Sequence, residues 1–129
     1  MLIVETKTEH EITDYPGLIA EQIQQLLDRR DELEAEIQEL EDAGIAGANP
    51  HYREDKYLYL IYPTQPDGSR KREYIGNKPE AIQEALARVE RFKIHATKSR
   101  ELKGLESTLR SAGYELSQVL NHLRRDHRW

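Results

Sequence analysis

The chain of 129 residues contains no cysteine, which excludes disulfide bonds, thiol nucleophiles and zinc sites with cysteine ligands. Apolar residues are also scarce: they make up 37% of the sequence, while charged residues make up 33%. A compact globular domain normally carries more apolar and fewer charged residues. Elongated helices with wide solvated faces, or burial against a second copy, would account for this balance.

Long apolar runs are absent as well. No stretch approaches the roughly 18 to 20 consecutive apolar residues that a transmembrane helix needs. Residues 1–5 lack the basic region and the long apolar core that begin a signal peptide. We therefore expect a cytoplasmic protein, and its length indicates a single domain.

Sequence motifs for catalysis and for cofactors are missing too. There is no Walker-type loop, no Gly-x-Ser-x-Gly, no His-Glu-x-x-His and no zinc-ligand spacing. His122 and His127 are five residues apart, so they do not share a helix face as metal ligands three or four residues apart would. We predict a protein that is not an enzyme and that uses no metal and no cofactor.

The net charge of −5 is unevenly distributed along the chain. Residues 1–50 contain three basic and thirteen acidic side chains, whereas residues 51–129 contain sixteen basic and eleven acidic side chains. The acidic total disfavours a general DNA-coating protein but leaves room for a local basic surface. Attraction between the two halves, within one chain or across a dimer, is the alternative explanation.

Residues 14–43 have the pattern of an acidic heptad helix. Asp14 can cap the free backbone N–H groups at its start, and Gly44 and Gly47 end it. Apolar residues recur at alternating steps of three and four, the spacing of a coiled-coil seam. The residues of this first seam are Ile19, Ile23, Leu26, Leu33, Ile37 and Leu40.

Residues 78–126 carry a second apolar seam. Asn77 and Glu80 can form a capping box at its start. The seam shifts by one residue near residues 95–100 and contains Gly113, so one long helix and two helices are both open. We favour one helix because the seam continues past Gly113. The residues expected to pack within the chain or between copies are Leu102, Leu105, Leu109, Leu116, Val119 and Leu123.

Residues 52–76 alternate as a β-hairpin rich in tyrosine and arginine, and five of the seven tyrosines lie there. Pro66-Asp67-Gly68 is a strong turn signal between its strands. A further edge strand is expected within residues 1–12, at Leu2-Ile3-Val4. The predicted fold is α+β and mostly α, with long coiled-coil-like helices flanking a small antiparallel sheet.

Alternation divides the side chains of this hairpin between two faces. If Leu58, Leu60 and Ile75 face the helices, tyrosines and arginines of both strands share the exposed face. Arginine can bridge phosphates and tyrosine can stack or donate a hydrogen bond, and a β-ribbon fits the major groove. An ordinary solvated sheet, with its arginines paired to acids of the first helix, and a protein-binding surface are the alternatives. The candidate nucleic-acid contacts are Arg53, Lys56, Tyr57, Tyr59, Arg70, Lys71, Arg72 and Tyr74.

From Lys56 to Phe92 the chain has an aromatic strand, a Pro-Asp-Gly turn, a strand ending in Tyr-Ile-Gly, and a helix that opens Asn-Lys-Pro-Glu-Ala. This order resembles the arm-binding domain at the N-terminus of phage-type tyrosine recombinases. It is also similar to short prokaryotic proteins of unknown function whose hairpin ends in Arg/Lys-x-Tyr-Ile-Gly. The resemblance covers less than a third of the chain and includes no recombinase catalytic domain. For arm-binding domains it implies DNA contact through the sheet, and no chemistry, by the residues Tyr57, Tyr59, Arg70 and Arg72.

Two functions remain open on the sequence. The first is a small homodimeric accessory protein, from a mobile element or a phage, that binds double-stranded DNA through the sheet. Arg30 in the first seam disfavours a simple parallel zipper, since two copies would bring like charges together. The second is a coiled-coil adaptor or inhibitor, for example a phage or plasmid factor that blocks a host nucleic-acid machine. It would act through the acidic helix around Glu34, Glu41 and Asp42.

Overall fold

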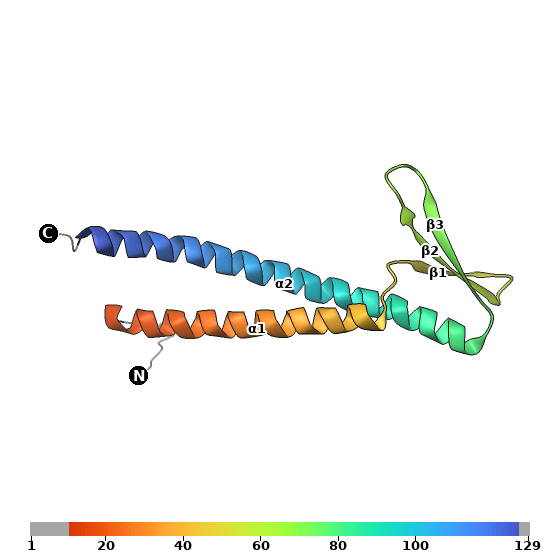
Figure 1. Cartoon of the computed structure of the whole chain (residues 1–129), viewed down its shortest axis with the longest axis horizontal. Coiled ribbons are helices and arrows are strands. Elements are labelled where there is room, and N and C mark those ends of the chain that lie inside the picture. The colour runs from red at the N-terminus through yellow and green to blue at the C-terminus, as the bar shows by residue number, and fades with distance from the viewer. Residues whose placement is uncertain (1–10, 127–129) are drawn as a thin grey trace, which may run out of the picture. The chain divides into compact units, whose positions relative to one another are not determined.

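The computed structural model of the protein describes residues 11–126. The fold is α+β and mostly α, with a small antiparallel sheet, which confirms the predicted class (Figure 1). The edge strand expected at Leu2-Ile3-Val4 lies outside the described residues. The elements in chain order are the 3-10 turn η1 (Ile12–Asp14), α1 (Tyr15–Ala43), β1 (Asn49–Arg53), β2 (Tyr57–Thr64), β3 (Arg70–Gly76) and α2 (Pro79–Asp126).

The chain divides into two compact units. The helical unit contains the described residues up to Asp31 and those from Leu105 onward, and it consists of η1, the first part of α1 and the last part of α2. The sheet unit, Glu32–Gly104, contains the remainder of both helices and all three strands. Each unit therefore offers a different kind of surface, one made of helices alone and one that includes the sheet.

The end of α1 shows two different uses of glycine. Gly44 has a φ of +103°, a region that favours glycine, and its N–H contacts the carbonyls of Leu40 and Glu41 at 3.1 Å each. Gly47 is needed for space instead, because a Cβ there would lie 2.8 Å from Cζ of Phe92. The sequence predicted only that the helix ends here, whereas the structure shows that the connection to β1 also passes close to α2.

α2 is one uninterrupted helix. Neither the shift of the seam near residues 95–100 nor Gly113 breaks it, so of the two possibilities left open by the sequence the structure has the single helix. It begins at Pro79, whose missing N–H would have no partner in the first helical turn. Arg124 and Arg125 lie in its last turn, where positive charge interacts favourably with the helix dipole.

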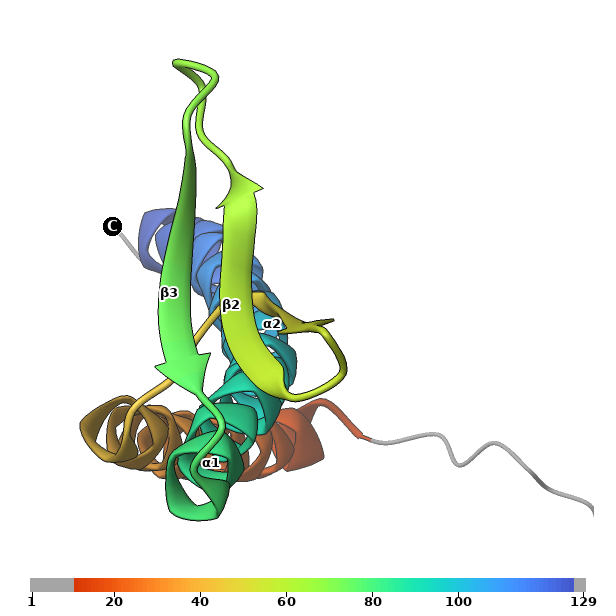
Figure 2. The same ribbon diagram turned by 90° about the vertical axis from the view of Figure 1, so that its right-hand side faces the viewer.

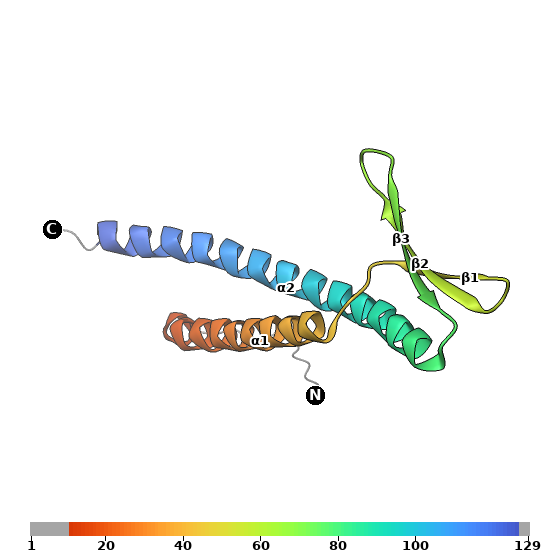
Figure 3. The same ribbon diagram turned by 45° about the vertical axis from the view of Figure 1, so that its right-hand side comes forward.

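The sheet is an antiparallel meander in the order β1-β2-β3, with its two turns at opposite ends (Figure 3). β1 was missed in the sequence, because Asn49 and Pro50 are poor strand formers. Proline is tolerated since β1 lies at the edge of the sheet, where a missing N–H breaks no second ladder. In the turn that follows, Glu54 and Asp55 both have positive φ values, of 54° and 60°.

The loop between β2 and β3 is the turn that Pro66-Asp67-Gly68 predicts. Oδ1 of Asp67 accepts hydrogen bonds from the N–H of Ser69 at 2.9 Å and from its hydroxyl at 2.7 Å. Both hydrogen bonds lower the pKa of Asp67, and the bond from the backbone N–H of Ser69 has the larger effect. Figure 2 shows β2 and β3 side by side, with this loop at the far end of the hairpin from the start of α2.

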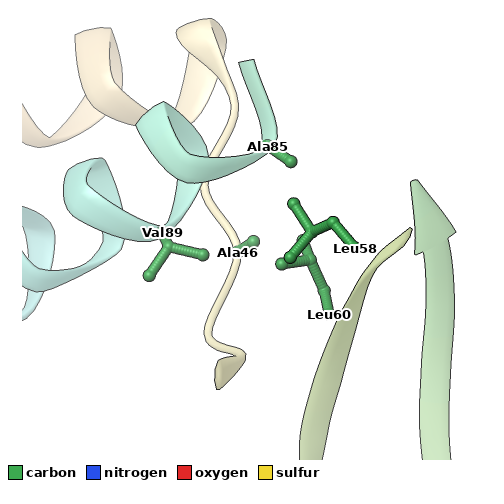
Figure 4. Packing of buried hydrophobic residues seen from close by; sticks show 5 residues of the cluster. All are labelled: Ala46, Leu58, Leu60, Ala85 and Val89. Carbon is green, nitrogen blue, oxygen red and sulfur yellow. The ribbon is translucent and has the colours of Figure 1, made fainter. Parts of the chain in front are cut away.

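The core of the sheet unit lies between the inner face of the sheet and α2. Leu58 and Leu60 of β2 are completely buried, and they pack with Ala85 and Val89 of α2 and with Ala46 of the α1–β1 connection (Figure 4). The two small alanines let the helix and the connection approach the strand closely. The condition stated from the sequence, that the β2 leucines face the helices, is therefore met.

Within the sheet unit, α1 and α2 run antiparallel and pair inside one chain. Nε2 of His95 lies 2.8 Å from a carboxylate oxygen of Glu41, and Nζ of Lys98 lies 2.9 Å from Glu36. Between these polar edges the first seam is packed, and Leu33 has no exposed surface. Of the two ways of burying the seams left open by the sequence, this part of the chain uses the intramolecular one.

Candidate nucleic-acid interface

A polar network joins the inner face of the sheet to α2. Tyr62 donates a hydrogen bond from its hydroxyl to Oε1 of Glu73 at 3.0 Å, and Nη1 of Arg88 lies 3.1 Å from Oε2 of the same carboxylate. The hydrogen bond from Arg88 lowers the pKa of Glu73, although partial burial opposes this shift. Burial is also the main reason why the pKa of Tyr62 is raised. The network therefore fixes the position of β3 against the helix.

Replacing Glu73 with glutamine is expected to make the fold less sensitive to acid. The pKa of Glu73 is lowered in the folded state, so its carboxylate stabilises the fold at pH values above the ordinary pKa that it has in the unfolded chain. That stabilisation is lost as the pH falls through the lowered folded value. Urea unfolding at pH 7 and at pH values below about 4 should show a smaller loss of stability for E73Q than for the wild type. Glu90→Gln, an exposed change on α2, is the control and should behave as the wild type does.

Arg91 of α2 is also used to hold the fold together. Its Nε donates a hydrogen bond to the carbonyl of Gly44 at 2.6 Å, and its Nη2 donates to the carbonyl of Ala43 at 3.0 Å. Nη2 also lies 2.6 Å from a carboxylate oxygen of Glu84. These contacts satisfy backbone carbonyls at the end of α1, which a helix leaves without partners. The arginines of α2 that adjoin the sheet are therefore occupied within the protein.

The outer face of the sheet, on the side away from the core, carries alternate side chains of all three strands. Tyr59 of β2 lies opposite His51 of β1 and Tyr74 of β3, and Ile61 lies opposite Arg72. A register irregularity after Ile61 places the last residues of β2 differently, so that Thr64 pairs with Arg70. The outer face consists of His51, Arg53, Tyr57, Tyr59, Ile61, Arg70, Arg72 and Tyr74.

An aromatic pair lies at the middle of this outer face. The ring centroids of Tyr59 and Tyr74 are 5.0 Å apart, with an angle of 53° between the ring planes. The guanidinium carbon of Arg53 lies 5.8 Å from the Tyr59 centroid, which is within cation–π range. Together with Tyr57 and Glu54 these residues line a shallow hollow of about 260 Å³. The hollow therefore offers three aromatic rings and one guanidinium group to a ligand, with a single carboxylate, that of Glu54, at the β1–β2 turn.

The arginines of the outer face have no carboxylate partner among the residues that the structure describes. Within residues 11–126, no ion pair joins Arg53, Arg70 or Arg72 to a carboxylate. Arg70 donates hydrogen bonds only to the hydroxyl oxygen of Thr64, at 3.0 and 3.2 Å. The alternative in which these arginines pair with acids of the first helix therefore has no support among the described residues. The four carboxylates between residues 49 and 76 lie in the turns or on the inner face, at Glu54, Asp55, Asp67 and Glu73.

The structure brings together seven of the eight residues chosen from the sequence. Lys56 adjoins the face from the β1–β2 turn, with Nζ 5.3 Å from the centroid of Tyr57. Lys71 is the exception: it lies on the inner face, with Nζ 5.1 Å from the centroid of Tyr62. Sequence reasoning missed His51, because no strand was expected at Asn49–Arg53 and the alternation that would have placed it was not considered.

No protein family, no curated protein and no solved structure matches the chain. In the part of the chain that the structure describes, no group of three or more His, Asp or Glu side chains is placed to hold a metal ion. No described helix combines the length and the apolar character that crossing a membrane requires. The geometry and charge of these surfaces therefore carry the functional conclusion.

Proposed function

We propose that the protein is a non-enzymatic accessory protein that binds double-stranded DNA through the outer face of its sheet. The observation that carries this proposal is the set of three arginines on that face, Arg53, Arg70 and Arg72, which have no ion-paired carboxylate within the described chain. Guanidinium groups bind phosphate through paired N–H donors, and most protein–DNA hydrogen bonds go to the phosphate and sugar backbone.

The placement of charge across the sheet supports a duplex as the ligand. Arg53 lies on one outer strand, while Arg70 and Arg72 lie on the other, with Tyr59 on the central strand between them. Adjacent strands are about 4.8 Å apart, so the two outer strands are separated by roughly 10 Å. The major groove of B-DNA is about 12 Å wide. Arginines on the two edges can therefore reach phosphates on both sides of one groove.

The remaining expectations form part of the same proposal. The order of elements from Lys56 to Phe92 and its resemblance to recombinase arm-binding domains support a protein from a mobile element or a phage. We also propose that it acts in the cytoplasm as a homodimer, because two sheets would bind one duplex more tightly than a single sheet.

The adaptor function through the acidic helix has less support. Of its three named acids, Glu41 contacts His95 at 2.8 Å, and Oδ1 of Asp42 accepts a hydrogen bond from Gln38 at 2.9 Å. Only Glu34 points outward without a partner of this kind among the contacts described here. Glu41 and Asp42 thus have contacts within the chain, whereas Arg53, Arg70 and Arg72 have no ion-paired carboxylate among the described residues, so DNA binding through the sheet is the better-supported function.

The salt dependence of DNA binding tests the proposal. We expect the purified protein to bind a short labelled duplex of random sequence. The logarithm of its association constant should fall against the logarithm of the salt concentration with a slope of about −3 for each bound sheet, and so about −5 when both sheets of a homodimer bind, since each neutralised phosphate contributes about −0.9. Fluorescence anisotropy between about 50 and 200 mM salt measures this slope. Absence of binding at the lowest salt, or an affinity that does not respond to salt, would contradict the proposal.

A single strand of the same sequence, measured in the same way, is the comparison for the duplex. Base stacking on exposed tyrosines favours single strands, whereas arginines on two edges of a sheet favour the fixed phosphate spacing of a duplex. We expect the duplex to bind more tightly. Tighter binding of the single strand would overturn the assignment of double-stranded DNA as the ligand.

A further inference from the structure

The helical unit exposes the residues that the heptad pattern would bury. Val119 and Leu123 hold seam positions on α2, yet they are 52% and 50% exposed, and Ile19 on α1 is 36% exposed. Leu33 holds an equivalent seam position in the sheet unit and is completely buried. Leu105, also in the helical unit, is buried, so the described chain covers the seam there but leaves it uncovered at Ile19, Val119 and Leu123.

The space between these residues is a substantial apolar hollow. Ile23 and Leu26 of α1 face Leu116 and Val119 of α2 across a volume of about 470 Å³. An adjoining hollow of about 520 Å³ shares several of these residues and extends to Ile12. Exposing an apolar surface of this kind to water is unfavourable. Contiguous exposed apolar patches therefore usually mark a binding site.

Both helices carry few charged residues along this hollow. Residues 15–27 of α1 contain a single charged side chain, Glu21, and residues 111–123 of α2 contain only Glu115. In the whole chain charged residues make up 33%. A solvated helix of this protein would therefore be expected to carry about four charges over the same length. Depletion of charged residues is the compositional mark of the centre of a protein–protein interface.

The apolar stripe is also wider than a two-helix seam needs. Leu18 and Leu120 lie beside the seam positions, and they are 36% and 46% exposed. Two paired helices bury a narrow stripe at two positions in every seven, whereas a helix of a four-helix bundle buries a third position as well. In the sheet unit, by contrast, ion pairs from Glu36 and Glu41 border the seam. The helical unit thus has the pattern of half of a bundle.

We propose that a second copy of this chain covers the hollow, with the helical units of the two copies forming a four-helix bundle. This inference deepens the homodimer of the proposed function by naming the surface through which the copies meet. The rim of the surface is complementary in charge: Ile12 and Leu123 line one hollow, so Asp14 lies at the same end of the unit as Arg124. When two copies align in the same direction, Asp14 of the η1 turn in one copy lies at the same end of the bundle as the basic end of α2 in the other.

The mass of the protein in solution tests this inference without DNA. Light scattering after size exclusion should give the wild type twice the mass of the 15.1 kDa chain. Val119→Glu places a charge in the hollow and should halve that mass. Ile94→Glu is the matched control: it makes the same kind of change on α2, at a residue that is 46% exposed but lies in the sheet unit. We expect this control variant to remain dimeric.

Two results would overturn the inference. A wild type that is monomeric at micromolar concentration would leave the hollow to a different protein, and a V119E variant that stays dimeric would place the contact elsewhere. Circular dichroism must show that V119E is helical; if it is not, Leu123→Glu, one turn further along α2, repeats the test.

The anisotropy titration, run on the same samples, distinguishes the two proposals. A dimer that fails to bind DNA contradicts DNA binding through the sheet and leaves the bundle standing. A monomer that binds DNA contradicts the bundle and the homodimer and leaves DNA binding through the sheet standing.

Discussion

Replacing Arg70 and Arg72 together with alanine is expected to weaken binding to duplex DNA between tenfold and a hundredfold at about 0.1 M salt. Each arginine that contacts a phosphate releases about one counterion, so removing both should reduce the steepness of the salt dependence by about two for each bound sheet. The loss should be similar for every duplex sequence, because phosphate contacts carry no direct sequence information. Fluorescence anisotropy at several salt concentrations measures both quantities.

The control for this variant removes the same charge from a different surface. Arg100 and Lys103 are exposed on α2 within the sheet unit, and their joint replacement with alanine also lowers the net charge by two. If the outer face of the sheet binds DNA, the control should retain most of the affinity and its salt dependence. Equal losses in the two variants would show that binding depends on net charge and that the sheet has no special role.

The R70A/R72A variant should keep its fold. Arg70 bonds only to the exposed hydroxyl of Thr64, and both arginines lie on the exposed side of β3. Surface substitutions of this kind change the free energy of unfolding by about 0.5 kcal/mol or less. An unchanged melting temperature would therefore assign the loss of binding to the missing guanidinium groups.

Replacing Leu60 with alanine is expected to destabilise the sheet unit by about 2 to 5 kcal/mol. Leu60 has no exposed surface and packs against Ala85, Val89 and Ala46, so its removal leaves a cavity that these small residues cannot fill. The melting temperature should fall by roughly 10 °C. Five of the seven tyrosines lie within residues 52–76, so the near-ultraviolet circular dichroism of tyrosine reports on this unit.

Ile94→Ala is the control for the core variant. Ile94 is apolar and 46% exposed on α2, so its truncation should cost about 0.5 kcal/mol or less. A loss below about 1 kcal/mol for Leu60→Ala would mean that the inner face of the sheet does not pack on α2 as described. Because the core holds β2 and β3 in place, we also expect L60A to weaken DNA binding at temperatures where the sheet unit is partly unfolded.

Much of the local structure was predictable because it depends on residues close together in the sequence. The heptad spacing predicted both helices, and Gly44 and Pro79 lie at their ends as helix-capping chemistry requires. Alternation predicted that Leu58 and Leu60 face the core and that Tyr59 faces away from it. In each case the deciding interaction, a cap, a turn or a strand period, spans only a few residues.

The strand β1 could not be predicted in the same way. Asn49–Arg53 contains Asn, Pro and His, which have little preference for strand structure. It becomes a strand because β2 offers a row of backbone partners, with His51 opposite Tyr59. That stabilisation comes from a neighbour in space, and so His51 joined the candidate site only when the sheet was seen as a whole.

By itself, the sequence determined where the helices and the hairpin form and which side chains alternate along them, because those choices depend on neighbours a few residues away. Only the tertiary structure decided which arginines are ion-paired and which seam residues are buried. Arg88 is paired with Glu73 while Arg72 is not, and Leu33 is buried while Val119, in an equivalent seam position, is half exposed. Burial and charge pairing depend on groups that are distant in the chain and meet only when it folds, and a periodic pattern carries no information about such partners.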